Sequence, residues 1–224
     1  MTRTSAFFIP EACTPDHRAS VARATSWPFR AHPSGRWYGP TMSRPLKPTK
    51  EAIAAAEDAR VADVIAPGLD VLFSGINPGL YSGAVGHHFA RPGNRFWKTL
   101  HAAGFTPRVL TPFEERELLD HGLGITNLVN RATATADGVS DEELRKGAAA
   151  LRRKVRRYRP RWLAMLGLSA YRVAFSAPRA GVGPTEVSIG GTNTWLLPNP
   201  SGLNAHYQLP DLARVFSELR EAST

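Results

Sequence analysis

The sequence predicts an α/β fold, a three-layer αβα sandwich with a mainly parallel central sheet. Short apolar runs alternate with longer segments of helical character, which is the order expected when each strand is followed by a helix that crosses back over the sheet. The runs are apolar throughout, as is typical of strands covered on both faces. We find no internal repeat and no second domain boundary, so residues 49–224 are predicted to form a single domain.

Composition and charge limit the classes of function. Lys and Arg number 28 and Asp and Glu 19, a formal net charge of +9, which is compatible with binding a polyanion such as nucleic acid. No apolar run reaches membrane-spanning length, and residues 6–9 are too short for the core of a signal peptide. The one cysteine, Cys13, excludes an internal disulfide and a Cys-ligated iron–sulfur cluster. We therefore expect a reducing, cytoplasmic setting.

Residues 1–48 form a basic, proline-rich arm without apolar periodicity. They hold seven basic and two acidic residues, a balance of 7 − 2 = +5. We predict a disordered or loosely attached segment, because this composition buries too little surface to offset the entropy of ordering. Two interpretations stay open: a solvated tail or sequence upstream of a true start at Met42, and an arm that adds nonspecific phosphate contacts.

The first predicted elements are a helix and a buried strand. Residues 49–60 are Ala-rich and begin with Thr49, a good helix N-cap. Residues 71–74 run without a charge into Gly75-Ile-Asn-Pro-Gly79, where Gly and Pro predict a tight turn. Asn77 is thereby placed at the carboxyl end of a parallel strand, the rim at which α/β sheets bind ligands.

The remaining elements continue the alternation. Residues 81–93 are a Gly-rich stretch, Asn94 caps a helix over 95–104, and Thr111 caps another over 112–120. The second half of the chain is predicted to contain strands at 123–129 and 162–166, a helix opened by the capping box Ser140-Asp-Glu-Glu143 and ending near Tyr158, a helix at 169–175, a hairpin or pair of strands at 186–189 and 194–197, and a helix at 209–222.

Three loops that follow strands should converge at one rim of the sheet. They are residues 76–79, 126–133 and 199–203. Within the third, Leu203 follows Pro-Ser-Gly in a polar loop. Two interpretations carry equal weight: a buried anchor of the loop, and an exposed wedge that enters a base stack.

Other kinds of site find little support. Gly75–Gly79 follows a strand but lacks the Gly-Lys-Ser/Thr of a phosphate-binding loop. His87 and His88 have no cysteine nearby and no His-Glu-x-x-His pattern, which favours structural or base-contacting roles over a metal site. Ser201 lacks a nucleophile elbow. The basic run at 152–161 ends a helix, and a solvated face that complements the helix dipole is preferred over direct DNA contact.

Four blocks, in this order along the chain, resemble the mismatch-specific uracil/thymine-DNA glycosylases of the uracil-DNA glycosylase superfamily. They are Gly75-Ile-Asn-Pro-Gly-Leu80, Gly86-His-His-Phe-Ala-Arg-Pro-Gly-Asn-Arg-Phe-Trp-Lys98, Gly124-Ile-Thr-Asn-Leu-Val129 with Arg131, and Asn199-Pro-Ser-Gly-Leu203. The resemblance covers roughly residues 62–222 and implies a uracil-DNA glycosylase-like fold. It leaves the basic arm unexplained.

The resemblance also implies residue roles. Asn77 would position the attacking water, and Thr133 would support it near the reaction centre. Phe89 would stack on the flipped base and Asn127 would hydrogen-bond it. The full set of base-binding residues is Gly75, Ile76, Ser82, His88, Phe89, Asn127 and Asn199. The loop residues Ser201, Gly202, Leu203 and Asn204 would enter the gap left by the base and meet the opposing guanine.

The function implied is a monofunctional, monomeric DNA glycosylase in the nucleoid that flips and excises uracil from G·U mispairs in double-stranded DNA. It would leave an abasic site and use no metal or cofactor. The target atom is unreachable inside a duplex, so the nucleotide must swing out, and mispaired bases flip at lower cost. An amide such as Asn77 does not accept a proton near neutral pH. We therefore expect a slow enzyme that relies on stabilising the leaving base.

Some positions depart from the family pattern. Asn130 stands where an acidic residue is common, and Ala205 where an Arg is common. These departures motivate an alternative, a damage-binding or abasic-site-binding module with little turnover; a hydrolase of small nucleosides is a weaker one. Ser82 favours uracil over thymine, whereas His88 resembles members that accept thymine, so the preference among uracil, thymine and modified cytosine stays open.

Overall fold

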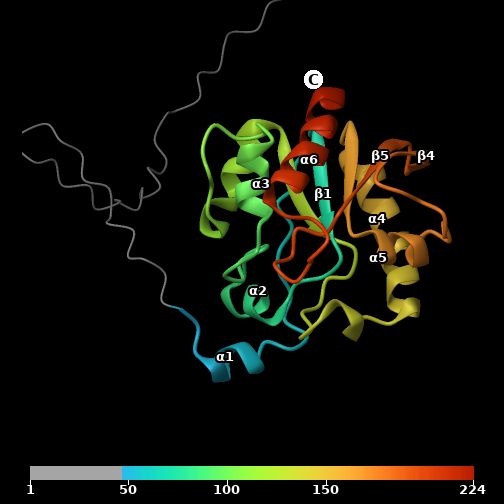
Figure 1. Cartoon of the computed structure of the whole chain (residues 1–224). Coiled ribbons are helices and arrows are strands. Elements are labelled where there is room, and N and C mark those ends of the chain that lie inside the picture. Colours follow the sequence, from blue (N-terminus) through green and yellow to red (C-terminus); the bar gives the residue numbers. More distant parts are fainter. Residues whose placement is uncertain (1–46) are drawn as a thin grey trace, which may run out of the picture. The chain divides into compact units, whose positions relative to one another are not determined.

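The computed structural model describes residues 47–224 (Figure 1). The predicted arm at 1–48 therefore lies outside the described residues, except for its last two positions. Within the described part of the chain, no helix is long and apolar enough to cross a membrane.

The central sheet has five strands in the order β2-β1-β3-β5-β4. They are β1 (Val71–Gly75), β2 (Leu123–Asn127), β3 (Trp162–Leu166), β4 (Gly183–Ile189) and β5 (Thr192–Leu197). All neighbouring strands are parallel except β4 and β5, which form the predicted hairpin as an antiparallel pair with an irregular register. The prediction of a mainly parallel sheet is confirmed. The chain leaves β1 towards β2 and leaves β3 towards β4 and β5 on the other side, so the connections diverge at the carboxyl ends of β1 and β3, which opens a crevice there.

Helices cover both faces of the sheet, which confirms the three-layer sandwich (Figure 1). The elements are α1 (Lys50–Ala54), α2 (Leu80–Val85), α3 (Phe96–Ala102), the 3₁₀ helices η1 (Pro112–His121) and η2 (Ala136–Gly138), α4 (Asp141–Tyr158), α5 (Leu168–Ala174) and α6 (Leu209–Ser223). Buried side chains of α3, η1 and α6 pack on one face, and those of α4 and α5 on the other.

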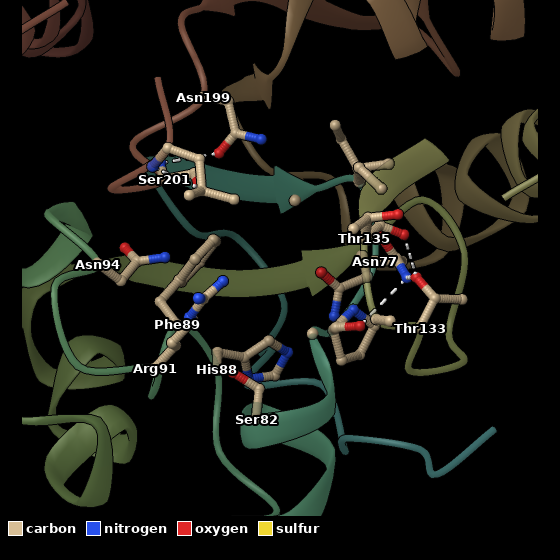
Figure 2. A pocket seen from close by; sticks show the side chains of 18 residues that line it. Asn77, Ser82, His88, Phe89, Arg91, Asn94, Thr133, Thr135, Asn199 and Ser201 are labelled. Atoms are coloured by element: carbon tan, nitrogen blue, oxygen red, sulfur yellow. Dashed lines mark hydrogen bonds between the residues drawn. The ribbon is translucent and has the colours of Figure 1, made fainter. Parts of the chain in front are cut away.

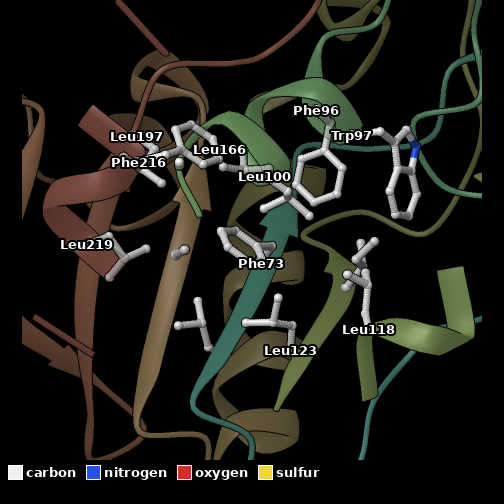
Figure 3. Packing of buried hydrophobic residues seen from close by; sticks show 14 of the residues in the cluster. Phe73, Phe96, Trp97, Leu100, Leu118, Leu123, Leu166, Leu197, Phe216 and Leu219 are labelled. Atoms are coloured by element: carbon white, nitrogen blue, oxygen red, sulfur yellow. The ribbon is translucent and has the colours of Figure 1, made fainter. Parts of the chain in front are cut away.

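The alternation of side chains along β1 divides the core between these faces. Val71 and Phe73 join the cluster with α3 and α6, while Leu72 points to the opposite cluster with α4 and α5. Figure 3 shows Phe73 among the side chains of the first face, where its ring lies 5.6 Å from that of Phe96 and 6.1 Å from that of Phe216. Apolar burial on both sides thus fixes the strand whose end carries the Asn77 loop.

Local sequence signals predicted where most helices begin, but predicted less well where they end. Thr49 caps α1, and the Ser140–Glu143 capping box opens α4 as predicted. However, α1 ends at Ala54 and not at residue 60, because the backbone of Asp58 and Ala59 hydrogen-bonds Ala132 in place of a further helical turn. Tertiary hydrogen bonds override the high helix propensity of Ala here.

Three segments differ from expectation. The Gly-rich stretch at 81–93 begins inside α2, which starts at Leu80. Gly83 lets this helix approach the loop after β2, because a Cβ at Gly83 would lie 2.8 Å from that of Ala132. The helix predicted at 112–120 is the 3₁₀ helix η1. Asn94 accepts a hydrogen bond from the Phe96 N–H at 2.9 Å, as a cap should, but α3 begins at Phe96 and ends at Ala102.

Candidate active site

The predicted site residues converge on a pocket at the carboxyl ends of β1 and β2 (Figure 2). Its volume is about 130 Å³, below the roughly 300 Å³ at which pockets for drug-sized ligands begin. A pocket of this size suits one small ring. Eleven of the thirteen predicted site residues line it: Gly75, Ile76, Asn77, Ser82, His88, Phe89, Asn127, Thr133, Asn199, Ser201 and Leu203. Gly202 and Asn204 do not line it.

Asn77 is held in one orientation by its side-chain nitrogen. Its Nδ2 donates to the carbonyls of Pro78 and Arg131, each at 3.1 Å, and to Thr133 Oγ1 at 2.7 Å. Thr133 Oγ1 gives its own proton to the Thr135 carbonyl at 2.6 Å, so towards Asn77 it can only accept. Because all three neighbours are acceptors, rotation of the amide, which would point Oδ1 at them, is disfavoured. Asn77 Oδ1, which has no partner among the described residues, is the atom left for the pocket.

Thr133 reaches Asn77 because the loops after β1 and β2 continue the strand pairing. The Thr133 N–H donates to the Pro78 carbonyl at 3.1 Å, and Gly79 and Thr133 form an isolated parallel bridge. Arg131 is fixed in turn by Glu143, whose Oε1 lies 2.6 Å from the Arg131 Nε. The hydrogen bond from Arg131, with further ones from Ser140, lowers the pKa of Glu143 to about 2. The first turn of α4 therefore supports the Asn77 loop through Arg131.

Gly75 permits two other walls of the pocket to come together. A Cβ at this position would lie 2.6 Å from Asn127 Oδ1 and 3.3 Å from the Phe89 ring. Phe89 is stacked from behind on Phe96, with ring centroids 4.1 Å apart and an interplanar angle of 25°. The ring is thus backed by another aromatic and lines the pocket, an arrangement suited to stacking on a planar ligand.

Asn127 carries an unused donor. The residue is 6% exposed, and its Nδ2 has no hydrogen-bond partner among the described residues. A buried polar group without a partner costs about 1–3 kcal/mol, so a ligand acceptor would relieve it. The carbonyl of Ile76 already accepts from the Val129 N–H at 2.9 Å. Any backbone contact from Ile76 to a ligand is therefore left to its N–H.

The histidine wall of the pocket is tied to η1. Glu115, which sequence reasoning missed, accepts from the His88 N–H at 2.9 Å and lies 3.0 Å from His88 Nδ1 and 2.8 Å from His87 Nδ1. Burial works to raise the pKa of Glu115, but the hydrogen bonds from His88 and His87 outweigh it and hold that pKa below its ordinary value. Ser82 is also buried; its Oγ accepts from the Ala90 N–H at 3.1 Å and steadies the same loop.

The loop after β5 carries Leu203, for which the sequence left two interpretations open. This side chain is 72% exposed, so it is no buried anchor. The Leu203 N–H donates to Ser201 Oγ at 3.3 Å, and the Ser201 N–H to Asn199 Oδ1 at 3.0 Å. Asn204, predicted to meet an opposing base, instead donates from Nδ2 to the Asn199 carbonyl and accepts at Oδ1 from the His206 N–H. It would have to leave these partners to contact DNA.

Arg95 at the start of α3 clamps this loop to the rest of the site. Its guanidinium donates to the carbonyls of Tyr207 at 2.6 Å, Asn204 at 2.8 Å and Ser201. Gly202 permits the close approach on the other side, because a Cβ there would lie 2.7 Å from the Gly93 carbonyl oxygen. The exposed Leu203 is therefore carried on a fixed loop beside the pocket.

The sequence model that matches this chain describes the Uracil DNA glycosylase superfamily, and it covers residues 62–221. The chain belongs to this superfamily. Its members are DNA glycosylases, which hydrolyse the bond between a base and its sugar. Among solved structures, the chain is similar to the solution NMR structure of a "putative Uracil DNA glycosylase" from Methanosarcina acetivorans, with a TM-score of 0.50 and 19% identity over 73% of this chain and 98% of that one. That likeness shows the uracil-DNA glycosylase-like fold.

In this superfamily member, several lining residues escaped prediction. Arg91, Asn94 and Thr135 line the pocket, and Arg91 is the one residue with a permanent charge among the described residues that do so. No group of three His, Cys, Asp or Glu side chains within the described range could hold a metal ion. Asn130, which departs from the acidic residue common in the family, is exposed and lies outside the lining of this pocket.

Proposed function

We propose that the protein is a monofunctional DNA glycosylase that removes uracil from G·U mispairs in double-stranded DNA and leaves an abasic site. The orientation of Asn77 carries the proposal. With Nδ2 held by three acceptors, Oδ1 is the end free to accept a hydrogen bond from a water molecule. A water held in a fixed position beside the sugar has the geometry that hydrolysis needs.

Hydrogen-bond donors to the departing uracil matter more for this reaction than a proton acceptor for the water. Cleavage of the glycosidic bond places negative charge on uracil and positive charge on the sugar. The unpartnered Nδ2 of Asn127 and the N–H of Ile76 are donors that could stabilise that anion. An amide at position 77 does not take up a proton near neutral pH, so the reaction would be dissociative and slow.

A duplex substrate is favoured by the loop after β5 and by the net charge. A base inside a duplex must be flipped out before it can enter a pocket. Leu203, 72% exposed and lining the pocket, has the position and chemistry of a wedge that fills the vacated stack. The formal charge of +9 suits contacts with phosphates.

The substrate range could extend to thymine or modified cytosine, and a panel of duplexes tests the whole proposal. Labelled duplexes would carry U, T or an alkylated C opposite G, with U opposite A and single-stranded U as controls. Alkali cleaves the strand wherever an abasic site has formed. We expect the fastest excision from G·U. Tight binding to an abasic duplex without release of uracil would instead support the binding module. Activity on free deoxyuridine alone would support a nucleoside hydrolase.

Asn130 bears on the choice between enzyme and binding module. The absence of an acidic residue there motivated the alternative without turnover. Because Asn130 is exposed and does not line the pocket, a carboxylate at that position would not line it either unless the loop moved. This observation supports turnover by the residues that do line the pocket.

A further inference from the structure

Glu115 is a buried carboxylate that the steps above do not use. It is 6% exposed, comes from η1, and faces the two adjacent histidines of the loop between α2 and α3. Its Oε2 accepts from the His88 N–H at 2.9 Å and lies 3.0 Å from His88 Nδ1; its Oε1 lies 2.8 Å from His87 Nδ1. Both carboxylate oxygens of Glu115 are thus engaged by the two histidines.

These contacts determine where the proton of a neutral His88 lies. An ionised carboxylate only accepts hydrogen bonds. The hydrogen bonds from His88 and His87 outweigh the effect of burial and lower the pKa of Glu115, so near neutral pH it is ionised. The atom facing Glu115, Nδ1, must then carry a hydrogen. In a neutral imidazole the second nitrogen, Nε2, is left with its lone pair as an acceptor.

Nε2 of His88 is buried and has no partner among the described residues. The side chain is 2% exposed and lines the pocket, where Figure 2 shows its ring beside Ser82 and facing the region of Asn77. Leaving a buried imidazole nitrogen unpaired is costly, and a donor on a bound ligand would satisfy it. Among the buried side-chain atoms without a partner in the described range, two belong to residues that line the pocket: the donor Asn127 Nδ2 and, in this tautomer, the acceptor His88 Nε2.

We propose that Glu115 is a positioning residue that fixes the Nδ1–H tautomer of His88, so that Nε2 selects bases carrying an imino N–H. The proposal rests on the proposed function. Uracil and thymine offer an acceptor at O4 next to a donor at N3–H, which matches one donor and one acceptor in the pocket. Cytosine has a bare N3 that would meet the lone pair of Nε2. Reversal of the tautomer would remove the acceptor for N3–H and so reduce this preference.

The other charged or titratable groups near His88 do not offer an alternative source of this polarity. Its own loop contributes His87, which shares the same carboxylate, and Arg91, which also lines the pocket. Glu115 from η1 is the one acid among the described residues that contacts His88. The acceptor state of Nε2 therefore depends on this single carboxylate.

Two substitutions separate positioning from simple support. In Glu115→Gln the amide oxygen can still accept from the His88 N–H and Nδ1, while the amide nitrogen meets His87. In Glu115→Met, of similar length, both acceptors are lost. Two-bond ¹⁵N–¹H spectra of imidazole-labelled, DNA-free protein assign the tautomer directly. We expect Nδ1–H for His88 in wild type and Glu115→Gln, and mainly Nε2–H in Glu115→Met.

The second readout is base selection under single turnover, with U and C each opposite G. We expect Glu115→Met to excise uracil about tenfold more slowly, with the U-over-C ratio reduced, and Glu115→Gln to stay close to wild type. Thermal melting identifies variants that fail to fold. A wild-type Nε2–H tautomer would overturn the proposal, as would an unchanged U-over-C ratio in a folded Glu115→Met with the reversed tautomer. If wild type excises no uracil, the proposed function and the base-selecting role both fail, whereas the spectra still decide the tautomer.

Discussion

Replacement of Thr133 by Val tests whether its hydroxyl orients Asn77 or takes part in the chemistry. The side chain is 3% exposed, and Val has nearly the same shape, so packing is preserved. Two hydrogen bonds are lost: the one from Asn77 Nδ2 at 2.7 Å and the one to the Thr135 carbonyl at 2.6 Å. Thr135 is exposed, and water can satisfy its carbonyl.

The magnitude follows from what remains around Asn77. Its two amide hydrogens keep two acceptors, the carbonyls of Pro78 and Arg131, each at 3.1 Å. The Asn77 amide is therefore held less firmly but keeps its orientation. The loss of one neutral hydrogen bond corresponds to about 1 kcal/mol, which is roughly fivefold in rate. Thr133→Ser, which keeps the hydroxyl, should lie within about twofold of wild type.

The assay is single-turnover release of uracil from a G·U duplex, with thermal melting to verify the fold of each variant. A roughly fivefold slower Thr133→Val agrees with an orienting role. A loss of a hundredfold or more in a folded variant would refute the reasoning, because such a loss requires the hydroxyl to contact the reacting atoms. An unchanged rate would refute it as well, since Asn77 would then be oriented without Thr133.

Three further substitutions probe the loop after β5 and the buried acid. Leu203→Ala should leave the melting temperature unchanged, because the side chain is 72% exposed. It should lower kcat/KM on duplex DNA by about tenfold to a hundredfold, since burial of the side chain in the base stack would contribute about 1.5–3 kcal/mol. Single-stranded DNA containing uracil is the control, and an equal loss on both substrates would contradict a wedge. Arg95→Met removes the donor to three loop carbonyls and should raise KM for the duplex at least about tenfold, with Arg95→Lys intermediate; an unchanged KM would mean the loop needs no clamp. The lowered pKa of Glu115 stabilises the fold above its unfolded-state pKa of roughly 4.3, and this contribution is lost as pH falls through the folded value. Urea titrations should therefore show a flatter acid dependence for Glu115→Gln, and an identical slope would contradict this.

Burial patterns and turn residues made the sheet predictable from the sequence. Residues 162–166 match β3, and those at 71–74 match β1 to within one residue, because apolar runs ending at glycine leave few other solutions. The position of Asn77 at the carboxyl edge of the sheet was predicted from these strands alone. The capping box at Ser140 likewise fixed the start of α4, since it depends on residues three positions apart.

Contacts between distant residues could not be predicted in this way. Glu115 lies 27 positions from His88, and Arg95 106 positions from Ser201, so no local period links them. The helix α2 was not predicted because it contains Gly and Ser, which have low helix propensity. It packs on the loop after β2. The proposed roles of Phe89 and Thr133 came from a family resemblance, and only tertiary structure could show that Leu203 is not a buried anchor.

The measurement closest to the central claim compares wild type with Asn77→Ala in single-turnover release of uracil from a G·U duplex. Binding of both proteins to an abasic duplex would be measured in parallel. The account predicts that wild type releases free uracil, and that Asn77→Ala still binds the abasic duplex but releases uracil at least about a hundredfold more slowly, as expected when a group that acts only in the transition state is removed. Wild type that binds without releasing uracil, or Asn77→Ala as fast as wild type, would contradict it.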